Sequence, residues 1–235
     1  MRKKYSCLFL AAGVFLVPLS YYLWAIHDAR SHTQSHIAAA YAQWGSGVEV
    51  SSVGSKRMDW LLAVEDPAFF SHQGVDLETP GAGMTTLTQG LAKLLYYPNG
   101  FKPGFAKIRQ TLIARYALDE LVSKEEQLRL FLNIAYLGAE NGKPVRGFGA
   151  ASKVYFGKSL PELTDREFLS LVAMLIGPNA RKPGTPENLR RVKSIEGFLA
   201  GKIVPASVLD VEYEGKRSGS LAEEAAMAFL RLITA

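Results

Sequence analysis

The first pattern along the chain is an uncharged, mostly apolar run from Tyr5 to Ile26. A membrane-spanning helix needs roughly 20 apolar residues, and this run reaches that length. The positive cluster Arg2–Lys4 before the run and Asp28 after it favour a cytoplasmic N-terminus and an exported body. A cleaved signal peptide is the competing interpretation, but its apolar region spans only about 7–15 residues. Residues 1–27 are therefore expected to form a cytoplasmic tip and an uncleaved transmembrane anchor.

The rest of the chain carries mainly helical patterns of apolar residues. Residues 28–55 are polar and Ala-rich and are predicted to be a juxtamembrane segment. Two pairs, Ser123 with Glu126 and Thr164 with Glu167, have the spacing of capping boxes at helix starts. No alternating run is long enough to predict a sheet, so the predicted fold class is mainly α. Helices are expected near residues 37–44, 60–65, 85–95, 105–121, 123–132, 164–176, 186–200 and 221–233.

Composition narrows the class of protein. The 235 residues suffice for one domain and an anchor, and 48% hydrophobic with 21% charged residues fit a folded chain. The net charge of +5 is compatible with nucleic acid, an anionic membrane surface or a phosphorylated substrate, and does not choose among them. Cys7 is the only cysteine in the sequence, which excludes an intrachain disulfide and a cysteine-based zinc site.

The segment EDPAFFSHQG, residues 65–74, is the first candidate for chemistry. Glu65 follows an apolar helix and lies among aromatic residues. Such surroundings desolvate a carboxylate and raise its pKa, as general-base catalysis near neutral pH requires. The alternative is that Glu65 and Asp66 are solvated acids at a helix end and that His72 is a local cap.

A second candidate is the segment GMTTLTQGLAK, residues 83–93. Thr85 and Thr86 stand at an expected helix start, and Gln89 and Lys93 follow at one-turn intervals. Backbone N–H groups and the dipole at a helix start favour a phosphate there, and a nearby lysine adds to this. The alternative is an ordinary threonine N-cap.

The order of these residues resembles the family 51 glycosyltransferases, the peptidoglycan glycosyltransferase domains of bifunctional penicillin-binding proteins and monofunctional transglycosylases. The pattern Glu-Asp-x-x-Phe-x-x-His-x-Gly and the following Thr-Thr-Leu-Thr-Gln segment match its first two motifs. Three further segments, residues 123–133, 147–158 and 163–178, are similar to later motifs, and Arg190–Val192 falls on the last. The resemblance covers about residues 58–200, which predicts a glycosyltransferase domain over 56–200 and a helical tail over 201–235.

The resemblance implies a mainly helical, lysozyme-like fold and a reaction on lipid II, a disaccharide-pentapeptide carried on undecaprenyl pyrophosphate. Lipid II would be polymerised into glycan strands and undecaprenyl pyrophosphate released. By position, Glu65 corresponds to the general base, and Lys93 would help to neutralise the pyrophosphate. The positions that match substrate-binding or supporting residues are Asp66, Phe69, His72, Gly74, Thr85, Thr86, Gln89, Lys93, Lys107 and Arg109.

The chain departs from the family pattern at acidic positions of the third and fourth motifs. Thr111 stands where the third motif ends in a second Glu, and Arg129 replaces the Glu of the fourth motif. The connection over residues 74–83 is also shorter than usual. These changes motivate an alternative, a catalytically impaired relative that binds lipid II or cell-wall synthesis partners as a scaffold. A lysozyme-like hydrolase is a third hypothesis, which the family-specific motifs argue against.

The expected partners are lipid II, the growing glycan strand, the membrane and other cell-wall synthesis proteins. The export signal argues against nucleic acid. No dedicated metal site is predicted, although a divalent cation, Mg²⁺ or Mn²⁺, is compatible with the pyrophosphate. The expected location is the inner (cytoplasmic) membrane, crossed once, with the catalytic domain on the periplasmic side.

Overall fold

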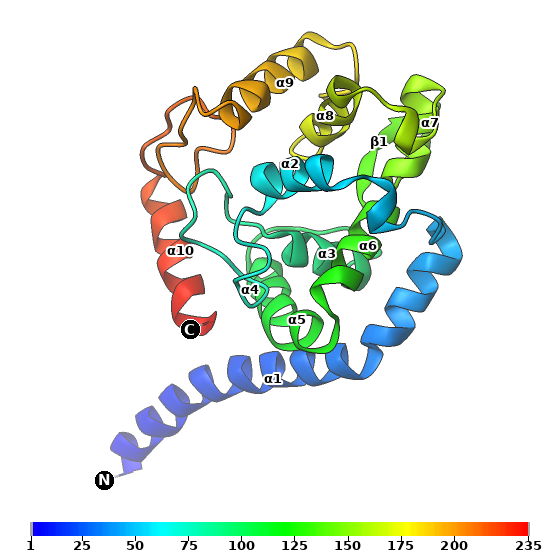
Figure 1. The fold of residues 1–235 in the computed structure, drawn as a ribbon. Coiled ribbons are helices and arrows are strands. Elements are labelled where there is room, and N and C mark those ends of the chain that lie inside the picture. The colour runs from blue at the N-terminus through cyan, green and yellow to red at the C-terminus, as the bar shows by residue number, and fades with distance from the viewer. Residues whose placement is uncertain (1, 235) are drawn as a thin grey trace.

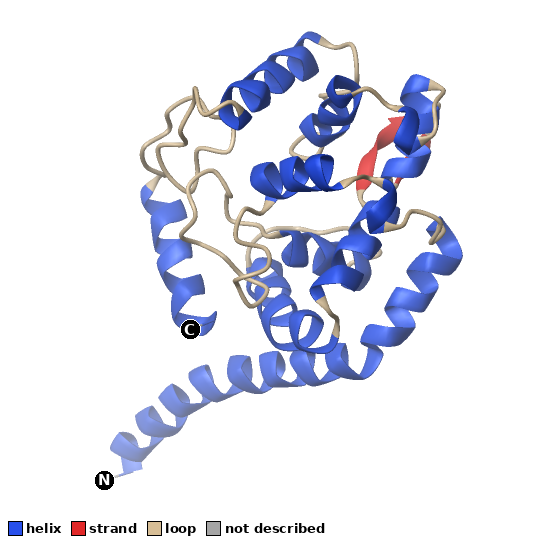
Figure 2. Ribbon diagram, in the orientation of Figure 1, coloured by secondary structure: helices blue, strands red, loops and turns tan. Residues whose placement is uncertain are grey.

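The computed structural model describes residues 2–234, with side chains described from Leu16 to Thr234. Helices form almost all of the regular structure, which confirms the mainly α prediction (Figures 1 and 2). The elements in chain order are α1 Arg2–Trp44, η1 Val50–Ser52, α2 Ser55–Glu65, α3 Leu87–Tyr96, α4 Phe105–Ile113, η2 Ala114–Leu118, α5 Asp119–Leu121, α6 Lys124–Ile134, β1 Tyr136–Glu140, β2 Lys143–Arg146, α7 Phe148–Phe156, η3 Leu160–Glu162, α8 Asp165–Met174, α9 Pro186–Leu199 and α10 Leu221–Thr234.

Helix α1 runs along the lower edge of the body in Figure 1 and then turns up beside it. It buries one stripe of residues, Ala25, Ala29, Thr33 and Ile37, at the four-residue spacing of a single helix face. The Thr33 hydroxyl lies 2.7 Å from the hydroxyl of Tyr96 at the end of α3. The segment expected to be juxtamembrane therefore forms, up to Trp44, part of a helix that packs on the body.

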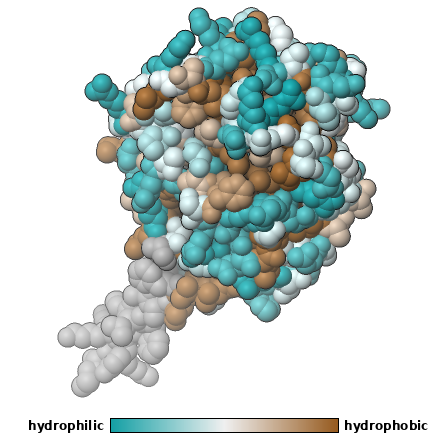
Figure 3. All heavy atoms as spheres, viewed as in Figure 1, coloured by the Kyte–Doolittle hydropathy of each residue, from teal (hydrophilic) through white to brown (hydrophobic). Residues whose placement is uncertain are grey.

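The expected membrane-spanning helix over residues 5–26 is not supported by the structure. In the part of the chain that the structure describes, no helix is both long enough and apolar enough to cross a membrane. The side chains of residues 5–15, half of the expected span, lie outside the described residues. Next to them α1 exposes Leu16, Val17, Leu19, Leu23 and Trp24. Figure 3 shows hydrophobic residues at the lower edge of the body.

The predicted helix starts are confirmed. Thr164 and Glu167 form a complete capping box. The Ser123 hydroxyl accepts the N–H of Glu126 at 3.2 Å, but the Glu126 side chain accepts from Tyr41 and does not complete the expected box. The helix expected over residues 105–121 continues from α4 through the π-helical turn η2 to α5. Helices α3, α6, α7 and α8 meet in one core whose largest fully buried side chains include Phe148 and Phe168.

The prediction of no sheet is wrong for residues 136–146, where β1 and β2 form an antiparallel hairpin. Asn141 and Gly142 both adopt positive φ, 50° and 75°, which suits a two-residue turn between right-twisted strands. Tyr136 pairs with Arg146 at the open end of the hairpin. The Asn-Gly pair is a strong sequence signal for a hairpin, and a sheet search based on alternation alone overlooks such short strands.

Candidate functional site

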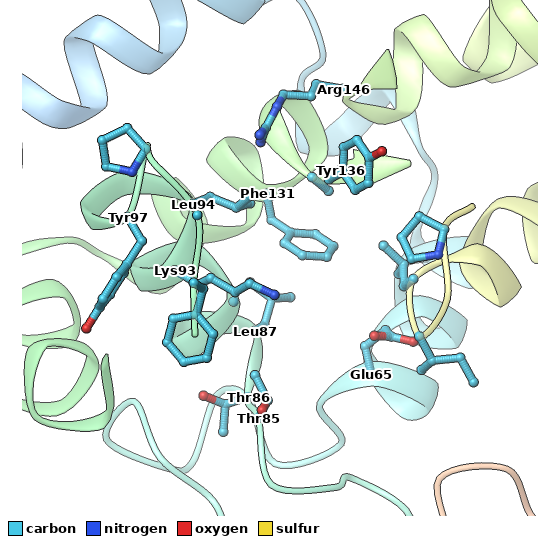
Figure 4. A pocket seen from close by; sticks show the side chains of 18 residues that line it. Glu65, Thr85, Thr86, Leu87, Lys93, Leu94, Tyr97, Phe131, Tyr136 and Arg146 are labelled. Carbon is cyan, nitrogen blue, oxygen red and sulfur yellow. The ribbon is translucent and has the colours of Figure 1, made fainter. Parts of the chain in front are cut away.

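A cavity of about 570 Å³ lies between the end of α2, the helix α3 and the open end of the hairpin. Its walls also include the loop after α3 and residues 175–178 beyond α8. Figure 4 shows Glu65 on one side, Thr85 and Thr86 at the bottom and Lys93 reaching across from α3. Four predicted site residues, Glu65, Thr85, Thr86 and Lys93, therefore line one cavity.

Glu65 is the last residue of α2 and is half-buried in the cavity wall. Burial raises the pKa of its carboxyl to about 7, the Arg191 charge opposes this rise, and the Asp66 charge adds to it. A carboxylate with this pKa is partly ionised at neutral pH and basic enough to accept a proton there. The geometry therefore suits Glu65 to act as a general base.

Asp66 lies behind the cavity wall, fully buried. Its Oδ1 lies 2.9 Å from Nε2 of His72, and its Oδ2 accepts the N–H of Leu87, the first residue of α3, at 2.8 Å. Phe69 is buried beside His72, with the Lys124 ammonium 4.6 Å from its ring centre. These residues hold the base segment against α3 and do not line the cavity.

Gly74 closes the base segment with a φ of +80°. A Cβ there would lie 2.6 Å from the carbonyl oxygen of Ala114, so only glycine fits without movement. Its own carbonyl accepts the hydroxyl of Thr86 at 2.7 Å. Gly74 therefore joins the base segment to the start of α3 and takes no place in the cavity wall.

The start of α3 is fixed by a capping box. Thr86 accepts the N–H of Gln89 at 3.1 Å, and the Gln89 side chain accepts the N–H of Thr86 at 3.0 Å. Gln89 is fully buried, and its amide also donates to the Thr111 hydroxyl at 2.8 Å. Gln89 thus positions the threonines at the cavity floor from behind.

The third-motif residues form the support under that floor. Lys107 donates to the carbonyl of Met84 at 2.8 Å and to the Thr85 hydroxyl at 2.9 Å, and burial lowers its pKa to about 7. Arg109 lies with its guanidinium 5.5 Å from the ring centre of Tyr97. Neither Lys107 nor Arg109 lines the cavity, although Tyr97 does.

The two replaced acidic positions also lie away from the cavity. Thr111 is fully buried and donates to the carbonyl of Lys107 at 2.8 Å. Arg129 pairs with Glu49 at 3.1 Å and with Glu126 at 3.6 Å on the outer side of α6. Among the described residues that line the cavity, Glu65 is the only carboxylate.

Arg146 is a cavity residue that the sequence analysis missed. It projects from β2 into the top of the cavity in Figure 4, between the Trp44 ring at 4.9 Å and the Tyr136 ring at 5.6 Å. Burial lowers the pKa of its guanidinium. The Asn-Gly turn would have pointed to it, because a hairpin places Arg146 opposite Tyr136. With Lys93, it gives the cavity two cationic side chains facing one acid.

Among the described residues, the cavity offers few side-chain ligands to a divalent cation. The described residues contain no group of three or more His, Cys, Asp or Glu side chains placed to hold a metal ion. A hard cation such as Mg²⁺ prefers several oxygen ligands, and the cavity offers one carboxylate.

Comparison with known proteins places the chain in a family. The family model described as Transglycosylase matches residues 32–197, more than half of the chain. The chain belongs to the transglycosylase family. The match begins within α1 and ends near the end of α9, so the transglycosylase region includes every residue that lines the cavity.

Several relatives are penicillin-binding proteins. Penicillin-binding protein 1B of Buchnera aphidicola (subsp. Acyrthosiphon pisum) is 37% identical over 142 residues, 55% of this chain and 18% of that protein. Penicillin-binding protein 1B of Escherichia coli is 32% identical over 139 residues, which are 54% of this chain and 16% of that protein. Penicillin-binding protein 1A of Haemophilus influenzae is 32% identical over 183 residues, which are 72% of this chain and 20% of that protein. The chain thus spans about a fifth of the length of these curated relatives.

Proposed function

We propose that this transglycosylase-family chain is a peptidoglycan glycosyltransferase that polymerises lipid II and releases undecaprenyl pyrophosphate. The observation that carries the proposal is Glu65, a carboxylate with a pKa near 7, in one cavity with Lys93 and the start of α3. The arrangement places a base on one side and an anion-stabilising wall on the other. Family membership adds support, because the matched region includes both.

In the proposed reaction, Glu65 accepts the proton of the acceptor's GlcNAc 4-hydroxyl. That oxygen forms a bond to the anomeric carbon of the growing chain, and the bond from this carbon to the lipid pyrophosphate breaks. The electron pair leaves with the pyrophosphate, whose negative charge Lys93 and Arg146 stabilise. The dipole at the start of α3, beside Thr85 and Thr86, favours the same charge.

We also propose that the start of α1 holds the enzyme at the inner membrane, with the catalytic domain on the periplasmic side. Support comes from the apolar run of the sequence, the positive residues Arg2–Lys4 before it and the exposed apolar residues of α1 beyond Phe15. A site next to the bilayer would meet a substrate whose lipid tail stays in the membrane. A protein held at this membrane would also meet other cell-wall synthesis proteins, which are proposed partners.

The test is polymerisation of labelled lipid II by the purified full-length protein in detergent. Glu65→Gln keeps the size of the side chain and removes its basicity, so it should abolish strand formation while the circular dichroism spectrum stays unchanged. The matched control is Glu78→Gln, an exposed glutamate in the loop after the base segment. Glycan strands from Glu65→Gln would refute the base assignment. A folded wild-type protein that binds lipid II without polymerising it would favour the impaired relative.

A further inference from the structure

The segment after α9 lies beyond the family match and packs on the short loop that leads to the cavity floor. Gly81 donates its N–H to the carbonyl of Ser207 at 2.8 Å, and Gly83 donates to that of Val208 at 2.8 Å. Both glycines have positive φ, and a Cβ on Gly81 would lie 2.8 Å from Pro205. The tail and the loop therefore interlock at backbone distance.

The same segment is stiffened by Asp210, which is almost fully buried. Its carboxylate accepts the N–H groups of Ala206 and Glu214, each at 2.9 Å, and of Gly215 at 3.1 Å. These hydrogen bonds hold the pKa of Asp210 below its usual value, although burial opposes them. Tyr213 within this turn has a φ of 64°, which is uncommon for a bulky residue and needs a supporting structure.

The ring of Tyr213 is buried between two residues of α9. The guanidinium of Arg191 lies 4.4 Å from its centre, and the Phe198 ring stacks against it at 4.6 Å. Arg191 is 4% exposed, and in the described part of the chain its Nη1 atom has no hydrogen-bond partner. A buried guanidinium short of hydrogen bonds depends on the face of an aromatic ring to stay in place.

Helix α9, which carries Arg191, packs against α2, which ends at Glu65. The Arg191 charge lowers the pKa of the Glu65 carboxyl. The other groups that face Glu65 are Asp66 at the end of its own helix and Tyr213 from the tail. Lys93 from α3 and Arg146 from β2 project into the same cavity.

We propose that Tyr213 is a positioning residue of the active site, which holds the Arg191 guanidinium in place behind the general base by stacking against it. The proposal rests on the proposed function, since it concerns the general base assigned there. It makes the tail beyond the transglycosylase region part of the catalytic machinery.

A second location is open to Arg191 when the ring is lost. Arg191 also lines a neighbouring polar cavity of about 440 Å³, whose walls carry both acidic and basic side chains, among them Glu214. Without the Tyr213 ring, the guanidinium would be free to move into this cavity and away from Glu65. The pKa of Glu65 would then rise, because desolvation would act with less opposing positive charge.

The experiment compares the full-length protein with Tyr213→Met, which removes the ring but keeps an apolar side chain, and Tyr213→Phe, which keeps the ring. The control Tyr41→Leu removes a ring beneath another arginine, Arg129, away from the cavity. Two quantities are measured: the pH profile of lipid II polymerisation and the ¹³C NMR titration of the Glu65 carboxyl, assigned by its loss in Glu65→Gln.

We expect Tyr213→Met to move both the acidic limb of the pH profile and the Glu65 titration upward by about half a pH unit or more. Tyr41→Leu should leave both within error of the wild type. Tyr213→Phe, which keeps the stacked ring, should move both by less than Tyr213→Met does. Arg191→Gln should raise the titration at least as far, and the double variant with Tyr213→Met should add nothing. An unshifted titration in folded Tyr213→Met, or full additivity in the double variant, overturns the proposal.

The proposed function and the positioning role of Tyr213 can be refuted independently of each other. A wild type that makes no strands, with a Glu65 titration that moves in Tyr213→Met, refutes the proposed function and supports the positioning role. Should Tyr213→Met not fold, Arg191→Gln carries the test. An unchanged pKa of Glu65 in Arg191→Gln overturns the proposal. A pKa of Glu65 that is raised in Arg191→Gln, and not to the same extent in Tyr213→Phe, supports it.

Discussion

The carboxylate of Asp66 accepts the backbone N–H of Leu87 at 2.8 Å, so the residue after the proposed base holds the first turn of α3. Its other oxygen lies 2.9 Å from His72. One buried side chain thus sets the distance between the base and the helix that carries Lys93. This relationship explains why Glu and Asp stand next to each other although only Glu65 lines the cavity.

We expect Asp66→Ala to destabilise the protein and to reduce polymerisation, because it leaves a buried N–H and a buried imidazole without their acceptor. The expected loss in the free energy of unfolding is about 2–4 kcal/mol, measured by urea unfolding in detergent. Asp59→Ala changes an exposed aspartate of α2 and serves as the control. Equal stabilities of the two variants would contradict the structural role of Asp66.

The raised pKa of Glu65 predicts a cost in stability at neutral and higher pH. Between about pH 4.5 and 7 the folded protein keeps a proton on Glu65 that the unfolded chain releases, so stability falls as pH rises through this window. Glu65→Gln should therefore be more stable than the wild type at pH 8, by up to about 3 kcal/mol, and equally stable near pH 4.5. Thermal unfolding across this range measures the difference, and a gain independent of pH would speak against the shifted pKa.

Lys93→Ala should reduce kcat for polymerisation on the order of 100-fold, since it removes a cation aimed at the departing pyrophosphate. Its side chain is exposed to the cavity and holds no ion pair among the described residues, so the fold should not change. Lys153→Ala, an exposed lysine of α7, is the control. Similar rates for both variants would remove Lys93 from the mechanism.

Thr111 is expected to contribute to stability and not to proton transfer. Thr111→Val leaves the buried Gln89 amide without its acceptor, at a cost of about 1–3 kcal/mol in the free energy of unfolding. Thr111→Ser keeps the hydroxyl and should lose much less, as urea unfolding would show. Restoring the family acid with Thr111→Glu would place a carboxylate in this buried space, so reduced stability is expected instead of higher activity. A more active, equally stable Thr111→Glu protein would contradict this reading.

The sequence predicted the helices well, because the signals for them are local. The threonine and serine caps and the helical spacing of the apolar residues depend on neighbours within one or two turns, and the capping box of Thr164 with Glu167 is an example. Glu65 could be selected because its aromatic surroundings are adjacent in the chain. The cationic wall could not be predicted in full, since Arg146 reaches the cavity only through the hairpin.

The roles of the supporting residues could not be predicted from the motifs, because a motif position does not show whether its side chain is buried. Gln89 and Asp66 stand in motifs of a substrate site, yet both are buried and bonded to the backbone of the cavity floor. Tyr213 had no sequence signal, because its partners Arg191 and Phe198 belong to a different element. Contacts between segments distant in the chain decided these positions.

Helix α1 begins outside the body and then packs along it, and this continuity fixes a geometry. Along an α-helix, Leu16 lies roughly 25 Å from Thr33, whose hydroxyl meets Tyr96 at the end of α3. One residue inserted between them would turn the outer half by about 100° relative to the cavity. The number of residues in α1 therefore sets the distance of the cavity from the start of the helix. It also sets the direction in which the cavity opens relative to that start.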